Sequence, residues 1–425
     1  MKKRLLALLL SLTLVATMFT GCGGSGSASN KEEKLETWED DYVFSFNNEK
    51  MHEKIQKLTG ITSRDITYAD VKGITEIEWY GNSDALKYFT GLKKLELRSA
   101  PDDFESLKYL TNLKELTLDY CDMEELTIPS TLKKLQSLII VNAENLETIN
   151  MAKLDKLGYL IIGKGTKIKD IKSFENLSNL KELSISGKIK NLDAIKNNTG
   201  LNKLEIYNCK IEDFSVLSNL KELKEINIYT SKLTDFSTLS SCPNLETLCL
   251  SKTEMTTLDL NCKNLKELRI SNCAELVDIK GLKGDSLESL EINYCKKLKD
   301  LSPIGKLESL TELTIDDIDG LKNLNEIKGA NKLEILHLSN CDDLEDLSAI
   351  LELNNLKTLD ITNLRGLKNI EVISNHNTLE VLIICIRNDI EDVYAFAKMP
   401  NLKFIKVEAN NCNINSIEEL RQYED

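Results

Sequence analysis

The chain has 425 residues, 29% of them charged, and a formal net charge of −14 at pH 7. An acidic protein repels polyanions, so the composition argues against nucleic acid as a partner. Aromatic residues make up only 6% of the chain, which argues against one large conventional core, whereas length alone suggests two or three domains.

The beginning of the chain has the organisation of a bacterial export signal. Basic residues at positions 2–4 precede an apolar run, residues 5–19, which is too short to span a bilayer comfortably. The following Thr-Gly-Cys22 resembles the lipobox of bacterial lipoproteins, although Phe19 stands in place of the usual Leu. We expect residues 1–21 to be a lipoprotein signal peptide and Cys22 to carry lipid, with ordinary signal cleavage as the alternative.

A flexible tether is predicted after the signal, over residues 22–44. The stretch GGSGSASNKEEK at 23–34 is rich in Gly and Ser and then charged, as linkers are. Two acyl chains on Cys22 are sufficient for stable anchoring. Without the three basic signal residues, 51 Lys and Arg face 68 Asp and Glu, a formal charge of −17. We expect a protein anchored by lipid to the extracytoplasmic face of the bacterial cell membrane.

Residues 45–91 are predicted to form an N-terminal cap and a degenerate first repeat. Met51, Ile55 and Leu58 are spaced to share one face of a short helix. Ile77 and Trp79 alternate with polar residues, as in a half-buried strand.

From residue 92 the phrase LxxLxL recurs, with Ile or Val allowed at its second and third apolar places. Its first leucines are Leu92, Leu113, Leu135, Leu157, Leu180, Leu201, Leu223, Leu245, Leu265, Leu287, Leu310, Leu333, Leu356, Leu379 and Leu402. The steps between them run from 20 to 23 residues. Such a narrow period is the signature of leucine-rich repeats, so we predict a solenoid of about 15 repeats over residues 92–410.

The pattern predicts the fold directly. The second and third apolar residues of each phrase point inward from a short strand, and one repeat cannot bury its apolar side alone. The expected fold is an α/β solenoid, a leucine-rich-repeat horseshoe. Its concave face is a parallel β-sheet, its convex face consists of short 3₁₀ or turn segments, and its N-terminus carries a helical cap.

The second half of many repeats carries an aspartate in one place. Its members are Asp213, Asp235, Asp278, Asp300, Asp346 and Asp392. Each precedes a short apolar-spaced turn, and a carboxylate there can accept backbone N–H bonds. We interpret these acids as structural caps and not as a catalytic set.

The repeat with this aspartate resembles the 22-residue class of internalins and related bacterial surface proteins. The resemblance covers roughly residues 45–425 and implies a cell-surface protein that binds another protein. Internalins typically attach through a wall anchor or wall-binding modules, whereas this chain offers only Cys22. Residues 411–425 are expected to be a C-terminal cap or tail.

Five cysteines occupy the ninth place of their repeats, where leucine-rich repeats carry Asn or Cys. They are Cys121, Cys209, Cys273, Cys295 and Cys341. A thiol there turns inward and acts as a weak donor to backbone groups, so we predict a structural ladder. A disulfide between Cys273 and Cys295 is an alternative interpretation, because the two residues lie at the same place in adjacent repeats. No metal site is expected, since CxxC pairs are absent and the three histidines are scattered.

The outward strand positions define the candidate binding face. Over all repeats they hold twelve acidic and five basic residues, which favours a basic or neutral partner. The candidate contacts are Ile139, Val141, Tyr159 and Ile161, with Tyr207 and Tyr229 nearby. A second apolar cluster comprises Val381, Ile383, Cys385 and Phe404. Exposed apolar clusters usually mark contact with a partner. Two alternatives stay open: strand propensity alone favours Ile and Val at these positions, and the C-terminal tail covers the second cluster.

Known catalytic motifs are not found in the sequence, including a nucleophile elbow, a P-loop, a dinucleotide fingerprint and an HExxH helix. We therefore expect no enzyme and no cofactor. The prediction is an adhesion or scaffold module that binds a protein of a host or bacterial surface through the concave face, with a surface glycan as the alternative ligand. The rival interpretations are a solute- or glycan-binding envelope lipoprotein, an envelope-associated enzyme and a structural spacer.

Overall fold

The computed structural model describes residues 35–99, 104–211, 213–232 and 234–421. The predicted signal peptide and lipidation site Cys22 lie outside these residues. The chain divides into a first unit, Met1–Thr37, and a compact second unit, Trp38–Asp425. All the repeats belong to the second unit.

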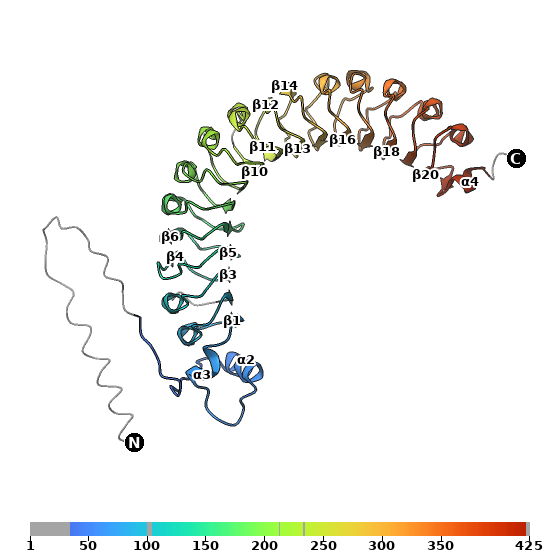
Figure 1. Ribbon diagram of the computed structural model, residues 1–425. Coiled ribbons are helices and arrows are strands. Elements are labelled where there is room, and N and C mark those ends of the chain that lie inside the picture. The colour runs from blue at the N-terminus through green and yellow to red at the C-terminus, as the bar shows by residue number, and fades with distance from the viewer. Residues whose placement is uncertain (1–34, 100–103, 212, 233, 422–425) are drawn as a thin grey trace, which may run out of the picture. The chain divides into compact units, whose positions relative to one another are not determined.

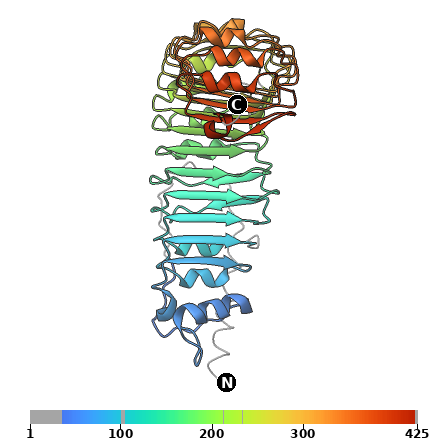
Figure 2. The ribbon, with the colours of Figure 1, turned by 90° about the vertical axis from the view of Figure 1, so that its right-hand side faces the viewer.

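One sheet of seventeen strands runs through the described part of the second unit, on its concave side (Figure 1). Along the sheet the strands are β1 (Glu76–Tyr80), β2 (Lys94–Arg98), β3 (Glu115–Asp119), β5 (Ser137–Val141), β7 (Tyr159–Ile162), β8 (Glu182–Ser186), β9 (Lys203–Tyr207), β10 (Glu225–Ser231), β11 (Thr247–Thr253), β13 (Glu267–Ser271), β15 (Ser289–Asn293), β16 (Glu312–Asp316), β17 (Ile335–Ser339), β18 (Thr358–Thr362), β19 (Val381–Cys385), β20 (Phe404–Glu408) and β21 (Asn413–Ile414). Every pairing is parallel except that of β21 with β20. Figure 2 shows the strands stacked side by side with their directions aligned.

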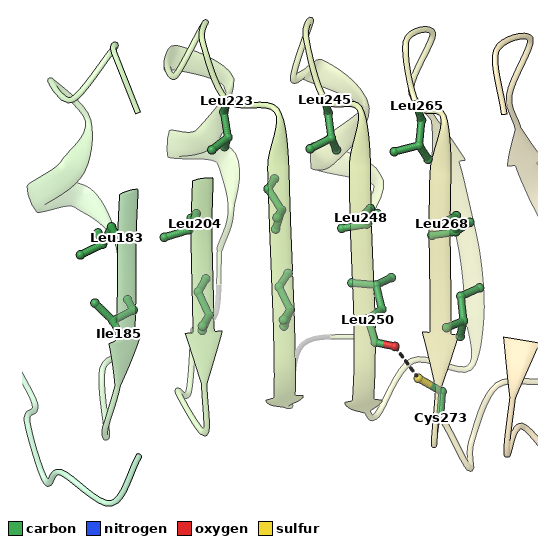
Figure 3. Packing of buried hydrophobic residues seen from close by; sticks show 14 of the residues in the cluster. Leu183, Ile185, Leu204, Leu223, Leu245, Leu248, Leu250, Leu265, Leu268 and Cys273 are labelled. Carbon is green, nitrogen blue, oxygen red and sulfur yellow. Dashed lines mark hydrogen bonds between the residues drawn. The ribbon is translucent and has the colours of Figure 1, made fainter. Parts of the chain in front are cut away.

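The inward residues of successive strands form continuous rows. Ile226 of β10 pairs in register with Leu204 of β9 and with Leu248 of β11, and all three side chains are fully buried. Just before the strands, Leu223 and Leu245 lie in a second row (Figure 3). Each repeat therefore buries its apolar side against its neighbours, and the predicted solenoid fold is confirmed.

Many strands of the sheet have a residue in the left-handed region of backbone conformation directly after their last residue or, in β10 and β11, one place before it. The non-glycine members, with φ from 51° to 59°, are Ser99, Tyr120, Asn142, Asn208, Thr230, Lys252, Asn272, Tyr294, Asp317, Asn340 and Asn363. Each stands seven places after the first leucine of its repeat. The chain thus turns away from the sheet in the same way in each of these repeats.

The convex side is built mainly from short 3₁₀ helices, as predicted. They are η1 (Asp84–Tyr88), η2 (Glu105–Tyr109), η3 (Lys172–Asn176), η4 (Asp193–Ile195), η5 (Ser215–Asn219), η6 (Ser237–Ser241), η7 (Ile304–Lys306), η8 (Asn325–Ile327), η9 (Ser348–Glu352), η10 (Ile370–Asn375) and η11 (Val393–Lys398). All six predicted aspartates accept a backbone N–H; for example, Ser237 N lies 2.8 Å from Asp235 and Ser348 N lies 2.8 Å from Asp346.

Two places on the convex side are extended instead. Strands β4 (Glu125–Ile128) and β6 (Thr148–Met151) pair with each other, as do β12 (Thr257–Asn261) and β14 (Asp278–Lys283). The predicted turn after Asp278 is therefore wrong, because this residue begins β14. Strict alternation in β12 buries Leu258 and Leu260, and this period suits a strand and not a 3₁₀ turn.

A helical cap covers the N-terminal end of the sheet. It contains α2 (Glu49–Thr59) and α3 (Tyr68–Val71). In α2, Met51 and Ile55 are buried as predicted, whereas Leu58 is 55% exposed, so its place on the buried face is wrong. The helix contacts β1 through Met51, whose sulfur lies 3.4 Å from Tyr80 N.

The compact body begins earlier than the predicted boundary at residue 45. Trp38 lies edge-on against Tyr88 at 4.9 Å between ring centroids, and Phe44 stacks on the same ring at 4.2 Å. Aromatic packing of this kind buries large apolar area. The end of the predicted tether is therefore part of the cap.

At the C-terminal end the short antiparallel β21 covers the last parallel strand, and α4 (Ile417–Arg421) follows it with Leu420 buried. None of the helices in the described residues is long and apolar enough to cross a membrane.

Candidate functional site

The five predicted ladder cysteines are buried where the chain leaves the strands. Their thiols donate to backbone carbonyls; Cys209 reaches Tyr207 O at 3.4 Å, and Cys341 reaches Ser339 O at 3.3 Å. Figure 3 shows the same inward placement for Cys273, whose sulfur lies 3.8 Å from Leu250 O. These thiols satisfy backbone carbonyls, and among the described residues none of them belongs to a group that could hold a metal ion.

Cys273 and Cys295 are adjacent free thiols in the structure. Cys273 also contacts the hydroxyl of Thr253 at 3.2 Å, and Cys295 donates to Asn293 O at 3.4 Å. A hydrogen bond with Cys273 and burial raise the pKa of Cys295 above its ordinary value.

Ile139 and Ile161 lie directly opposite each other on β5 and β7. Tyr159 pairs with Ser137 in the same ladder, and Val141 lies opposite Asp119 of β3. All four candidate side chains are half-buried, on the outward side of the sheet. They are close neighbours, but each presents only part of its surface to solvent.

A small pocket of about 60 Å³ opens on the concave face beside this cluster. Its lining residues are Tyr159, Ile161, Glu182, Leu183, Ser184, Lys203 and Glu205. The pocket thus includes two of the four clustered candidates, together with charged residues from β8 and β9. We call it the concave pocket.

The other two candidates, Tyr207 and Tyr229, stack face to face on β9 and β10. Their ring centroids are 4.7 Å apart and their planes differ by 3°. The Tyr207 hydroxyl reaches Glu205, a lining residue of the concave pocket, at 3.4 Å. The stacked pair therefore adjoins the pocket, and the structure brings the candidates of the first cluster and this pair onto one continuous face.

Lys164 contributes to this face although its position lies outside the strand phrase. Its Nζ lies 4.8 Å from the centre of the Tyr207 ring, a cation–π contact. The sequence signal for it is slight: the lysine lies between Gly163 and Gly165, and Gly165 has φ +97°. Strand positions alone do not predict a contribution from this loop.

One lysine organises the charges of the concave pocket. Lys203 Nζ lies 2.8 Å from Glu225 and 3.2 Å from Glu205. The hydrogen bond that Lys203 donates to the Glu225 carboxylate raises the pKa of Lys203. Burial works to raise the pKa of Glu225, but the ammonium of Lys203 holds it below its ordinary value. Burial raises the pKa of Tyr229, so this hydroxyl stays protonated.

The second apolar cluster lies on β19 and β20 at the other end of the sheet. Val381 pairs with Phe404, and Cys385 with Glu408. Phe404 remains 46% exposed, whereas Val381, Ile383 and Cys385 are half-buried. The described part of the C-terminal tail, residues 411–421, therefore leaves Phe404 uncovered. A pocket and a stacked aromatic pair accompany the first cluster, so we place the candidate site at the concave pocket.

Within residues 35–99, 104–211, 213–232 and 234–421, no group of three or more His, Cys, Asp or Glu side chains could hold a metal ion. The arrangement offers apolar contact, aromatic faces and a rim of carboxylates.

No protein-family model and no curated protein matches the chain. Solved structures do. A leucine-rich-repeat protein of Leptospira interrogans is 19% identical, with 83% of this chain and 92% of that chain covered and a TM-score of 0.56. The functional domain of InlJ from Listeria monocytogenes, which includes a cysteine ladder, is 19% identical, with 83% and 84% covered and a TM-score of 0.51. A chain of the mouse RP105/MD-1 complex is 20% identical, with 83% and 63% covered and a TM-score of 0.55. At these identities the likeness shows the fold: the protein is built as a leucine-rich-repeat solenoid.

Proposed function

We propose that the protein is a binding module that holds another protein on its concave face, at the concave pocket and the adjoining Tyr207–Tyr229 pair. The observation that supports this most directly is the grouping of partly exposed Ile and Tyr side chains around a pocket in a rigid parallel sheet. Tyrosines and a desolvated apolar centre are typical of protein interfaces.

Preorganisation of the concave face favours recognition. The outward side chains are fixed by strand pairing and by contacts such as the stacked tyrosines. A surface that is already ordered loses little conformational entropy on binding. Catalysis is not part of the proposal, since the pocket offers no nucleophile paired with a base.

The charges of the site define the chemistry of the partner. Glu182, Glu205 and Glu225 surround one pocket lysine, Lys203, and Lys203 is already paired with two of them. A partner segment with Lys or Arg beside an apolar side chain complements this rim and centre. The proposed partner is a protein of a host or bacterial surface, reached from a protein anchored through lipid on Cys22.

The test compares partner capture by the wild-type chain and by the double variant Ile139→Glu/Ile161→Glu. Two carboxylates introduced at directly opposed positions repel a partner that buries apolar surface there. We expect the variant to lose a specific partner from extracts of envelope and host-surface proteins, identified by mass spectrometry. For the purified partner, calorimetry is expected to show at least about a tenfold weaker affinity.

Thr314→Glu/His337→Glu is the matched control. These residues are directly opposed at the equivalent outward positions of β16 and β17, so the control adds carboxylates to the same face, away from the concave pocket. Equal capture by all three proteins would contradict the proposed site, and loss in both variants would point to general electrostatic repulsion.

A further inference from the structure

A cluster of lysines stands out against the acidic chain. Residues 163–210 hold ten lysines: Lys164, Lys167, Lys169, Lys172, Lys181, Lys188, Lys190, Lys196, Lys203 and Lys210. The same stretch holds five acids: Asp170, Glu175, Glu182, Asp193 and Glu205. This stretch is net positive within a chain whose total charge is −14.

Part of this cluster lies on one side of the solenoid, which we call its flank, in the segments that connect the strands to the convex side. The sequence Lys-Ile-Lys occurs at 167–169 and again at 188–190, and Lys-Ile at 210–211. In each copy the isoleucine is buried, so the lysines on either side of it point outward. Lys188 N donates to Ile168 O at 2.6 Å and Lys210 N to Ile189 O at 2.8 Å. These hydrogen bonds place the copies in successive repeats, with neighbouring backbones about 4.8 Å apart.

The lysines line a groove of about 450 Å³, which we call the basic groove. Its charged lining consists of Lys169, Lys188, Lys190, Lys210 and one acid, Asp170. The carboxylate of Asp170 already accepts the backbone N–H of Lys172 at 2.7 Å. The groove is therefore strongly positive, unlike the concave pocket on the neighbouring face.

Among the described residues, most of the groove ammonium groups form no ion pair. Lys169 forms an ion pair with Glu147 at 2.9 Å. Lys188, Lys190 and Lys210 have no acid within 4.0 Å in the part of the chain that the structure describes. Elsewhere on the flank, a lysine meets an acid of the adjacent repeat, as in Lys297–Glu275 at 2.6 Å. Like charges on neighbouring rungs repel, and a bound anion would remove this repulsion.

We propose that the basic groove binds a linear phosphate-bearing polymer, with successive phosphate groups held by lysines of successive repeats. Several ammonium groups spread along the rungs fit a chain of anions better than a single ion. Lysine acts as a point charge and recognises phosphate without the planar fork that arginine offers to carboxylates. The groove lining has no aromatic ring and so no surface for stacking bases, which disfavours nucleic acid.

The test measures binding of short-chain inorganic polyphosphate to the purified protein by calorimetry at two salt concentrations. We expect binding that weakens as salt rises, because phosphate contacts by lysine release counterions. Lys188→Gln/Lys190→Gln/Lys210→Gln is expected to bind about tenfold more weakly or worse, with a shallower dependence on salt.

Lys263→Gln/Lys299→Gln/Lys332→Gln is the matched control, since it removes the same charge from exposed lysines outside the groove. It is expected to bind as the wild type does. Polyphosphate is also expected to raise the melting temperature of the wild type and of the control, and not that of the groove variant, whose own melting temperature should be equal or higher without ligand.

Four outcomes would overturn the proposal: no binding by the wild type, equal loss in both triple variants, tighter binding of a single-stranded oligonucleotide than of polyphosphate, or binding only to vesicles containing anionic lipid. The variant Ile139→Glu/Ile161→Glu should retain polyphosphate binding, so this test and the test of the concave pocket fail or succeed independently.

Discussion

At the residue scale, the position seven places after the first leucine of a repeat has a left-handed backbone conformation in most repeats. This conformation restricts which side chains the position accepts at low cost. Asn adopts this conformation at low cost, whereas a β-branched residue does so at a high one. Asn208 and Thr230 hold the position in adjacent repeats, with φ of 55° and 59°. The same turn is therefore relaxed in one repeat and strained in the next.

We expect Thr230→Asn to stabilise the protein by about 1 kcal/mol, because it relieves the left-handed strain of a β-branched residue. The measurement is the midpoint of urea unfolding followed by circular dichroism. Asn208→Thr is the mirror control and should lower the midpoint by a similar amount. If both changes shift the midpoint in the same direction, the strain argument is wrong.

The sequence was sufficient for residues whose role follows from the repeat position and insufficient for those whose role depends on neighbours. Leu223 and Leu245 recur at one place in the repeat, so their buried row could be predicted. Lys164 reaches Tyr207 only because a glycine-containing loop directs it over the ring. Lys190 lies outside the strand positions, and its role in the basic groove depends on lysines of adjacent repeats.

At the element scale, the aspartate at the start of each convex turn works by holding a backbone N–H. The N–H of Ser237 lowers the pKa of Asp235 below its ordinary value of 3.8, and hydrogen bonds from Ser302 and Ser348 do the same for Asp300 and Asp346. A carboxyl whose pKa is lower in the folded state stabilises that state when ionised.

This contribution is present above the pKa of the unfolded chain and disappears as the pH falls through the folded pKa. We therefore expect the urea midpoint to fall as the pH is lowered below about 4. Asp235→Asn/Asp300→Asn/Asp346→Asn should show a smaller fall, because an amide oxygen still accepts the N–H and does not titrate. An equal fall in variant and wild type would assign the acid sensitivity to other carboxyls.

The choice between a 3₁₀ turn and a strand on the convex side was only partly predictable. The Asp-apolar pattern is similar in the repeats of Asp235 and Asp278, yet only the second begins a strand. The difference comes from the preceding repeat, where β12 presents an extended edge for pairing. A close approach also requires Gly281, where a Cβ would lie 2.5 Å from Asp259 Cα.

At the scale of the whole molecule, sequence predicted the architecture well because repetition averages out local ambiguity. One alternating phrase predicts a strand weakly, but the same phrase at a constant period requires the strands to stack. The boundary at residue 45 was less accurate because Trp38 and Phe44 lie outside the period, and their packing on Tyr88 is long-range.

The proposed lipid anchor belongs to this scale as well. In a bacterium that matures lipoproteins, we expect the full chain to partition into the detergent phase of a Triton X-114 extract. Cys22→Ala should move it to the aqueous phase, because two acyl chains provide the membrane affinity. Cys385→Ala is the control and should partition as the wild type does. Aqueous partitioning of the wild type would contradict lipidation.

The bonds between neighbouring repeats join equivalent atoms, as when Ile226 faces Leu204 on one side and Leu248 on the other. Genetic recombination between two copies removes or duplicates a full coil and leaves each junction as it was. A deletion of a few residues inside one repeat is not tolerated in this way, because the strand of that repeat would lose its register with the strands on either side. Length in this architecture therefore changes in whole units, and each unit gained or lost changes the stability by about one repeat and one interface between repeats.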